Sequence, residues 1–576
     1  MNKQRLTFDI EGNGLCEVSK NNKIYSTEAT VIWCISLYDI DSKQSYLFHG
    51  KDISKGVDML RKASLIIGHN VYGYDIPLIE RLYGPLNKKP FEEVYDTILV
   101  SRLMWPEITT NPLPRGSHSL QAWGEYLREE KQEYTQGWDA YSHQMGQYCV
   151  QDSIVTASIF NHQQYLPFVK KFKDAVKLEH EVASIIKNQV EAGFSFSISK
   201  AEELRDVLFM EKASIEDNMR VIFPTKTTER WSDKTGKRMK DGVEIFNPGS
   251  RQQIAERLIE KYNWVPTETE KGNPQVSEEV LSSLPYPEAV TLCQYFDSVK
   301  LLSQVSDWIS RASISRDNKI HGSMNVLGTV TGRMTSKEPN MQQVASDPRA
   351  RCLFTPSDGR VLVGADLKGL ELRMLAHYLY SYDNGKYAEV VCNGDVHTHN
   401  KEAMGLSSRD TAKVAIYCFL YGGGDEKFGK TINCSTNVAR KTKNNLLINI
   451  PGLQHLINKC KTDSIQLKHV HPFNFRPIPV RKEHAALNTL LQSSGALVSK
   501  VWTNEVNKEL ESNFPSTSYS WVANIHDELQ IECIPFIAQD VGNILLKAAI
   551  KSGVILKCMC PIEASFKIGN NWSETH

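Results

Sequence analysis

No run of apolar residues in this 576-residue chain approaches the roughly 18 that a membrane-spanning helix requires. Charge of one sign is not in excess either, since 67 basic residues balance 67 acidic ones, which argues against a protein that coats nucleic acid through charge alone. The 12 cysteines lack the paired spacing of a disulfide framework, and Cys558 and Cys560 have no second Cys or His pair to complete a zinc site. We therefore expect reduced thiols in a cytoplasm, in a chain that starts without a signal or transit peptide.

The order of sequence patterns indicates several domains. Residues 1–165 mix strands, expected over Thr30–Tyr38 and Ser64–Gly68, with helices such as 119–130. The Ser-Lys-Ala-Glu run at 199–202 has the spacing of a capping box and predicts the start of a long helix. Residues 224–243 are polar and rich in turn formers, which predicts an exposed insertion or linker.

A basic segment lies in the second half of the chain. Residues 436–482 hold nine Lys and Arg residues and one acid, Asp463. Such a segment can neutralise phosphates, or it can be a solvated loop region, and both interpretations stay open.

One stretch of 13 residues, 409–421, carries a distinctive repeat. Arg409, Lys413, Tyr417 and Tyr421 recur every four residues, so on an α-helix they form one stripe with cations at one end and aromatic rings at the other. A nucleoside triphosphate matches that order, because Arg and Lys bind phosphates and a tyrosine face meets the base. The alternative is an amphipathic helix whose polar edge happens to carry Arg and Lys.

Carboxylates near the N-terminus fit a metal site. The strand period of two places Asp9 and Glu11 on one face of the first strand. Two further segments extend the set. One is the run His69-Asn70-x3-Tyr74-Asp75, which contributes Asp75, and the other is the pair Tyr148 and Asp152, one helical turn apart. Four carboxylates and a tyrosine are what two-metal phosphodiester hydrolysis requires, with the tyrosine orienting the attacking water.

A second set of carboxylates lies downstream. Asp366 follows the apolar run 361–363, and a helix with Glu371 and Arg373 is expected directly after it. His526-Asp527-Glu528 interrupts a strand alternation and predicts a hairpin turn. Asp366 and Asp527 could meet at strand ends and bind a second metal pair, although a polar turn without function is the simpler interpretation of residues 526–528.

A rival motif points to a different class of enzyme. Residues 424–431 match the P-loop pattern G-x4-G-K-[ST], and the apolar run 414–421 before it could pass for a buried strand. Residues 432–437 are nevertheless a poor start for the helix that must follow a P-loop, and a strand at 409–421 leaves the four-residue stripe unexplained.

Taken in order along the chain, these segments resemble family A DNA polymerases, the DNA polymerase I family, and most of all the replicative polymerases of autographivirus-type short-tailed phages. The N-terminal carboxylates and Tyr148 are similar to the three motifs of a 3′–5′ proofreading exonuclease. The segments similar to polymerase motifs are Asp366-x4-Glu371-Leu372-Arg373 (motif A), Arg409-x3-Lys413-x3-Tyr417-x3-Tyr421 (motif B), His526-Asp527-Glu528 (motif C), Thr331-Gly332-Arg333 with Pro339-Asn340-x-Gln342, and 481–492.

The resemblance implies a multidomain α/β and α+β fold. An RNase H-like 3′–5′ exonuclease domain is expected at 1–165, followed by a right-hand polymerase domain at 166–576. Within the polymerase domain the expected parts are the thumb at 200–313 with the short insertion 224–243, the palm at 320–380 and 484–576, and the fingers at 381–483.

The resemblance also assigns roles. Mg²⁺, two ions per active site with Mn²⁺ as a substitute, is implied at Asp366, the Leu367 carbonyl and Asp527, and at the exonuclease residues Asp9, Glu11, Asp75 and Asp152. Glu528 joins the catalytic set, Lys413 protonates the leaving pyrophosphate, and Glu371 excludes a ribose 2′-hydroxyl. The implied nucleotide contacts are Arg351, Leu367, Glu371, His397, Arg409, Lys413 and Tyr417.

Contacts to DNA and to partners follow from the same likeness. Primer–template DNA is expected to contact Arg333, Asn340, Gln342, Tyr421, Arg481, His484, Asn488, Gln492 and His526, the residues at 484, 488 and 492 forming one polar helical stripe. Further expected partners are deoxynucleoside triphosphates, a helicase-primase and a single-stranded DNA-binding protein, with the enzyme a monomer in the cytoplasm of a bacterial host. Thioredoxin is not expected, because the thumb insertion is short, and a 5′ nuclease domain before Asp9 is not expected either. A nuclease-only descendant would require damaged polymerase carboxylates, whereas Asp366 and Asp527 are both present.

Overall fold

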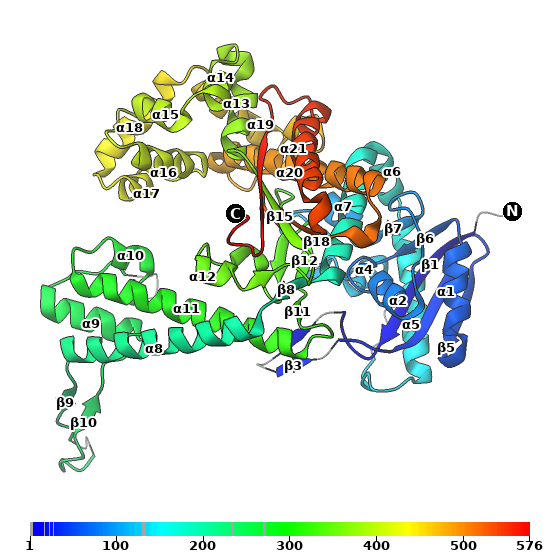
Figure 1. The fold of residues 1–576 in the computed structure, drawn as a ribbon, viewed down its shortest axis with the longest axis horizontal. Helices are drawn as coiled ribbons and strands as arrows, with labels where there is room; N and C mark the ends of the chain where they lie inside the picture. Colours follow the sequence, from blue (N-terminus) through cyan, green and yellow to red (C-terminus); the bar gives the residue numbers. More distant parts are fainter. Residues whose placement is uncertain are drawn as a thin grey trace. The chain divides into compact units, whose positions relative to one another are not determined.

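The computed structural model describes residues 4–16, 18–21, 24–26, 28–129, 134–231, 234–268 and 272–576 (Figure 1). The chain forms two compact units. One comprises the residues up to Ser195 together with 314–344 and 354–576, and the other comprises 196–313 and 345–353. Within the described ranges, no helix combines the length and the apolar character needed to cross a membrane.

A five-stranded sheet forms the N-terminal part of the first unit. Its order is β5-β4-β1-β6-β7, with β4 antiparallel to β1 and β5, and with β6 parallel to β1 and β7. The strands are β1 (Arg5–Gly12), β4 (Ile32–Asp39), β5 (Gln44–His49), β6 (Leu65–Gly68) and β7 (Val94–Asp96). The helices are α1 (Ile53–Lys62), α2 (Asp75–Tyr83), α3 (Thr97–Met104), α4 (Leu120–Leu127), α5 (His143–Phe160) and α6 (Tyr165–Lys171). The strands expected at 30–38 and 64–68 are confirmed as β4 and β6. The helix expected at 119–130 is confirmed over 120–127, and residue 130 lies outside the described residues. Helix α5 packs across β1 and β4.

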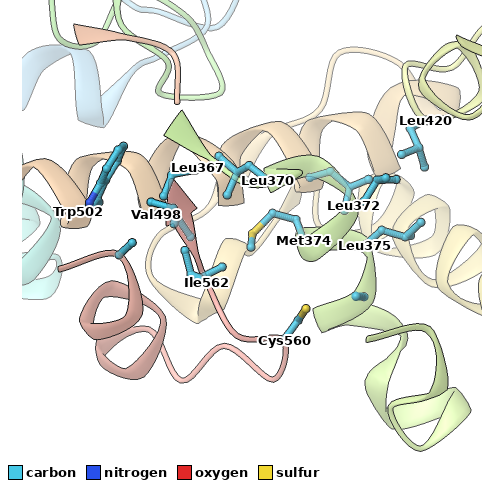
Figure 2. Close-up of a cluster of buried hydrophobic side chains, with 14 of the residues drawn as sticks. Leu367, Leu370, Leu372, Met374, Leu375, Leu420, Val498, Trp502, Cys560 and Ile562 are labelled. Carbon is cyan, nitrogen blue, oxygen red and sulfur yellow. The ribbon is translucent and has the colours of Figure 1, made fainter. Parts of the chain in front are cut away.

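A four-stranded antiparallel sheet forms the centre of the first unit, in the order β18-β19-β15-β20. The strands are β15 (Val361–Leu367), β18 (Tyr519–Ile525), β19 (Glu528–Cys533) and β20 (Ala564–Gly569), and the helices packed on them are α7 (Lys173–Ala192), α20 (Ala486–Asn513) and α21 (Ala538–Ile555). Figure 2 shows part of the core beneath this sheet, where Leu367 and Leu370 lie near Val498 and Trp502 of α20. Because the apolar residues of β15 are buried on this core, the strand end that carries Asp366 is held in place.

Seven α-helices lie between β15 and β16 in the chain. They are α13 (Leu370–Asp383), α14 (Lys386–Asn393), α15 (Val396–Met404), α16 (Arg409–Leu420), α17 (Asp425–Thr431), α18 (Thr436–Asn449) and α19 (Leu453–Gln466). The helix predicted from the four-residue repeat is therefore confirmed as α16, and Tyr421 is its C-cap. The basic segment 436–482 contains two helices, so the alternative of a loop region does not hold for 436–449 and 453–466.

The P-loop interpretation is wrong. The Gly-x4-Gly-Lys-Thr run forms α17, with Gly424 as its N-cap and Gly429 buried inside the helix. A P-loop binds phosphate with backbone N–H groups that point outward, whereas in a helix most of these groups bond to the preceding turn. Lys430 is exposed and pairs with Glu426 at 2.9 Å.

The second unit is a helical body with a hairpin. Its helices are α8 (Ile198–Ile222), α9 (Arg251–Tyr262), α10 (Glu278–Ser282), most of α11 (Pro287–Ile314) and α12 (Pro348–Arg351), and the hairpin pairs β9 (Lys226–Thr228) with β10 (Gly242–Glu244). The predicted capping box at 199–202 is wrong by two positions, because α8 begins at Ile198 with Ser197 as its N-cap. The predicted insertion 224–243 coincides with this mostly exposed hairpin.

The remaining short strands of the chain are β2 (Ser19–Asn21), β3 (Ile24–Ser26), β8 (Phe194–Phe196), β11 (Lys319–Ile320), β12 (Ser323–Asn325), β13 (Thr335–Lys337), β14 (Phe354–Thr355), β16 (His469–Val470) and β17 (Ile478–Pro479).

Candidate active sites

Two aspartates from distant parts of the chain meet at the ends of the central strands of the four-stranded sheet. Asp366 lies near the end of β15, opposite Glu528 of β19. Asp527 lies in the turn between β18 and β19, where His526 adopts a left-handed backbone with φ of 58°. The Leu367 amide donates a hydrogen bond to the Asp527 carbonyl at 3.0 Å, which joins the turn to the strand. The predicted turn at 526–528 is thus confirmed for its first two residues, while Glu528 begins β19.

The electrostatics of this pair fit a cation site. Burial raises the pKa of Asp366 to about 6, and the neighbouring charge of Glu528 adds to the shift. Burial also raises the pKa of Asp527 to about 7, with further contributions from Asp366 and Glu371. Carboxylates that repel one another in a partly buried place are stabilised by a divalent cation among them, and oxygen donors are the ligands that Mg²⁺ prefers. The residues present therefore fit such an ion.

Glu528 is already saturated with hydrogen bonds. Trp572 and Gln530 donate to its Oε1 at 2.6 and 2.8 Å, and His576 lies 2.8 Å from its Oε2. Burial by itself would raise the pKa of Glu528, but these hydrogen bonds, led by that of His576, lower it below its ordinary value. Glu528, which was predicted to be catalytic, is therefore an anion that the C-terminal segment helps to hold in place. The sequence motif did not indicate this role.

Glu371, on the first turn of α13, is also held by two neighbours. Its Oε1 accepts hydrogen bonds from Arg333 and from the Tyr421 hydroxyl, both at 3.2 Å. Glu371, Arg333, Tyr421 and Asp527 line one pocket of about 200 Å³. Tyr417 lies beside it, with its ring centroid 6.2 Å from that of Tyr421.

The two cations of α16 differ in their surroundings. Asp395 binds the Arg409 guanidinium through two hydrogen bonds of 2.7 and 3.1 Å, so this cation is paired, whereas Lys413 is exposed. His397 lies near both, and burial, followed by the charges of Arg409 and Lys413, lowers its pKa. Arg351 belongs to the second compact unit, where its Nε donates to the Ala345 carbonyl at 3.4 Å.

Most of the predicted DNA contacts line a second, larger groove of about 810 Å³. Those that line it are Arg333, Asn340, Gln342, Arg481, Gln492 and His526, together with Arg102 and His118 from the N-terminal part. His484 lies before α20, in the 3-10 turn Glu483–Ala485, so the prediction of one helix through 484, 488 and 492 is wrong at its first position. Arg481 pairs with Glu107 at 2.5 Å, and Asn488 is half-buried on α20.

Arg476 also lines this groove and was not predicted. It is 7% exposed, and among the described residues its Nη1 has no hydrogen-bond partner. Burial lowers its pKa while the charge of Glu179 opposes that shift. A buried guanidinium with an unused donor suits a phosphate, and the one signal for it in the sequence was its place in the basic segment 436–482.

The N-terminal carboxylates come together on the five-stranded sheet. Asp9 and Glu11 lie on β1, and Asp75 begins α2, where its Oδ1 accepts a hydrogen bond from the Ile10 amide at 3.2 Å. Burial, together with the charges of Asp96 and Asp152, raises the pKa of Asp75 to about 8. Asp9 and Glu11 lie beside a thiol that the motif did not include, that of Cys149.

The aromatic surroundings of Tyr148 were not predicted either. Tyr148 lies one helical turn before the buried Asp152 on α5. Its ring centroid is 5.9 Å from that of Tyr134 and 6.3 Å from that of Trp138. The predicted water-orienting tyrosine therefore belongs to an aromatic group, which only the path of the 134–142 loop creates.

An aspartate pair on an antiparallel sheet, next to a helix with cations and tyrosines, is an arrangement typical of enzymes that transfer nucleotidyl groups onto a polynucleotide. A family model described as DNA polymerase family A matches residues 224–574. The chain therefore belongs to DNA polymerase family A, and it is a DNA-directed DNA polymerase.

Relatives of this chain include phage and bacterial enzymes. It is 30% identical over 717 aligned residues to the DNA-directed DNA polymerase of Enterobacteria phage T3 and 29% identical over 720 to that of Escherichia phage T7, and both alignments cover 99% of this chain and 100% of the relative. Since the alignments are longer than this chain, both relatives carry insertions that it lacks. DNA polymerase I of Caldicellulosiruptor bescii is 26% identical over 58% of this chain and 41% of its own.

The fold is similar to that of a solved bacterial polymerase. The structure titled "POL domain of Pol1 from M. smegmatis complex with DNA primer-template and dNTP" matches with a TM-score of 0.79 and 16% identity, over 99% of this chain and 96% of that one.

Proposed function

We propose that this polymerase also proofreads. In this view it extends a primer at Asp366 and Asp527 and removes misincorporated 3′ nucleotides at the carboxylates of the N-terminal sheet. The observation that carries the proposal is that each of the two sheets brings together carboxylates from distant segments, with the raised pKa values of groups that need a cation.

Magnesium fits both carboxylate groups, with Mn²⁺ as a substitute. At the polymerase site Asp366, Asp527 and the Leu367 carbonyl would hold two ions, which when bound lower the pKa of the primer 3′-hydroxyl and neutralise the triphosphate. Asp366 and Asp527 orient the primer end and the α-phosphate for in-line attack. Glu528 keeps its negative charge and braces the strand next to them, since three side chains hold it.

The nucleotide is bound by α16 and its neighbours. Arg409 exchanges Asp395 for the triphosphate, and Lys413 neutralises the phosphates and donates a proton to the leaving pyrophosphate. Tyr417 faces the base, with His397 and Arg351 as further phosphate contacts. Glu371, held by Arg333 and Tyr421, lies against the sugar and excludes a 2′-hydroxyl by collision.

Primer–template DNA occupies the groove lined by the predicted contacts. Arg333, Asn340, Gln342 and Gln492 would read the minor-groove acceptors that all base pairs share, so binding would be independent of sequence. Arg476 and Arg481 would bind phosphates of the backbone. Tyr421, His526, His484 and Asn488 complete the proposed set of DNA contacts.

At the exonuclease site Asp9, Glu11, Asp75 and Asp152 would hold the ions, and Tyr148 would orient the attacking water. The proposed domains are an RNase H-like exonuclease at 1–165 and a polymerase with thumb at 200–313, palm at 320–380 and 484–576, and fingers at 381–483. The enzyme would work as a monomer in the cytoplasm of a bacterial host, with a helicase-primase and a single-stranded DNA-binding protein. Thioredoxin is left out of this set, because the insertion at 224–243 is short.

Extension of a labelled primer on a DNA template with Mg²⁺ tests both activities. With the four deoxynucleotides we expect growth of the primer, and without them shortening from its 3′ end. Lys413→Ala should abolish growth, while Lys430→Ala, in the discarded P-loop motif, should leave growth unchanged. Growth without any shortening would overturn the exonuclease part of the proposal.

A further inference from the structure

Two cysteine thiols that are far apart in the sequence lie next to each other in the first unit. The Sγ atoms of Cys392 and Cys560 are 3.7 Å apart, although 168 positions separate the two residues in the chain. Cys392 lies in the last turn of α14, and Cys560, labelled in Figure 2, lies in the segment between α21 and β20. A shift of about 1.7 Å shortens this separation to the roughly 2.05 Å of a disulfide bond.

Arg373 holds the two segments together. Its Nη1 donates a hydrogen bond to the Cys392 sulfur at 3.5 Å and another to the carbonyl of Pro561, the residue after Cys560. Its Nη2 donates to the Glu563 carboxylate at 3.0 Å. Because Arg373 is only 3% exposed, these bonds are shielded from water, and they keep α14 and the segment before β20 in contact.

The two thiols differ in their access to solvent. Cys392 is partly exposed, whereas Cys560 is fully buried. A partly exposed cysteine beside an arginine is the setting in which protein thiols react with oxidants. Burial raises the pKa of Cys560, so this residue stays a thiol in solution and reacts second. The pair therefore combines a thiol that an oxidant can reach with another thiol that is placed to react with the product.

We propose that Cys392 and Cys560 form a reversible disulfide bond when the protein meets a hydroperoxide. In the first step the Cys392 sulfur attacks the peroxide, the O–O bond breaks, and Cys392 becomes a sulfenic acid while an alcohol leaves, or water in the case of hydrogen peroxide. In the second step the Cys560 sulfur attacks the Cys392 sulfur, the S–O bond breaks, and the hydroxyl group leaves with the Cys560 proton as water. A thiol reductant restores both cysteines by exchange.

The disulfide would tie α14 to the segment before β20. It closes a long loop of the chain, which contains Arg409, Lys413 and Asp527 of the proposed polymerase site. A crosslink over a long loop stabilises the folded protein mainly because it restricts the unfolded chain. The oxidised protein should therefore unfold at a higher urea concentration than the reduced protein. This response to oxidants involves neither group of carboxylates and is independent of polymerisation and proofreading.

Treatment of the full-length protein with hydrogen peroxide tests the proposal. Free thiols are counted after denaturation, and mass spectrometry of the alkylated digest locates the bond. We expect the loss of two of the 12 thiols, a peptide that links Cys392 to Cys560, a raised urea midpoint, and reversal of all three by dithiothreitol. Cys392→Ser and Cys560→Ser should each abolish the linked peptide and the shift of the midpoint.

Cys558→Ser is the matched control, because Cys558 lies two residues from Cys560 and is partly exposed like Cys392. This variant should still form the linked peptide and show the shift. The fully buried cysteines Cys34 and Cys149, which pack together, are an internal control in the same digest and should stay reduced. Absence of the linked peptide in the wild type would overturn the proposal. So would its formation no faster than a peptide linking Cys34 to Cys149, or an equal shift of the midpoint in Cys392→Ser.

Discussion

The buried ion pair between Lys500 and Glu179 allows a quantitative prediction. Both side chains are nearly excluded from solvent, at 3% and 7% exposure, and the Lys500 Nζ donates to the two Glu179 oxygens at 2.8 and 2.7 Å. The pair joins α20, which lines the polymerase pocket, to α7. A buried charge that loses its partner costs about 3 to 5 kcal/mol, because its desolvation is no longer compensated.

The two single variants should differ within that range. In Lys500→Met the remaining Glu179 carboxylate still has the charge of Arg476 nearby, so we expect a loss in unfolding free energy near the lower end, about 3 kcal/mol. In Glu179→Leu two buried cations, Lys500 and Arg476, lose their shared anion, and we expect about 5 kcal/mol.

Urea unfolding followed by tryptophan fluorescence measures these changes, and Trp502, fully buried on α20 near Lys500, contributes to the signal. The double variant Lys500→Met/Glu179→Leu should cost less than the sum of the single variants, because it leaves only Arg476 uncompensated. Asn504, one turn further along α20, donates to Glu181 at 2.7 Å and offers a control contact between the same two helices, so Asn504→Ala should cost about 1 kcal/mol. Additive losses, or a larger loss in Lys500→Met than in Glu179→Leu, would refute the reasoning.

Three further predictions concern nucleotide binding and pH. Glu371→Ala should raise ribonucleotide incorporation by at least about tenfold relative to deoxynucleotides, because each 1.4 kcal/mol of steric repulsion removed from the 2′-hydroxyl is a factor of ten. Single-nucleotide extension measures this ratio. Asp395→Asn should lower KM for deoxynucleotides, because Arg409 no longer exchanges a carboxylate for the triphosphate; steady-state kinetics measures it. Burial lowers the pKa of His180 to about 4, below the value of about 6.5 in the unfolded chain. The stability that this shift contributes is therefore complete above pH 6.5 and is lost as the pH falls towards 4, about 3 kcal/mol in all. His180→Gln should remove this part of the acid sensitivity, as measured by urea unfolding across that pH range.

Each of these predictions has a control. Glu371→Gln keeps the size of the side chain and should keep the discrimination against ribonucleotides, so a loss there would contradict the collision argument. Asp410, exposed next to Arg409, is the control for Asp395, and an equal effect of Asp410→Asn would reduce the result to surface charge. Gln can replace both hydrogen bonds of His180, to the Val176 carbonyl and from the Asp96 amide, and an unchanged acid dependence would refute the assignment.

The sequence determined the local elements and the positions of the motifs. The four-residue repeat of α16, the apolar run of β15 and the interrupted alternation at 526–527 are set by side chains a few residues apart, so periodicity predicts them. The P-loop pattern shows the same limit, because eight residues do not reveal whether their backbone forms a loop or the helix α17. The signs against a P-loop came from its flanks, the poor helix start after it and the four-residue repeat before it.

The tertiary structure alone decided what surrounds those motifs. Several contacts at the sites join segments that no local sequence periodicity connects. They are the contacts of His576 with Glu528, of Asp395 with Arg409, and of Cys149 with Asp9. Sequence patterns record which face of an element is apolar, but the partner of a polar side chain depends on which elements the core brings together. The carboxylates could therefore be predicted as candidates, whereas their pKa values, their partners and the thiol among them follow from packing over long distances in the chain.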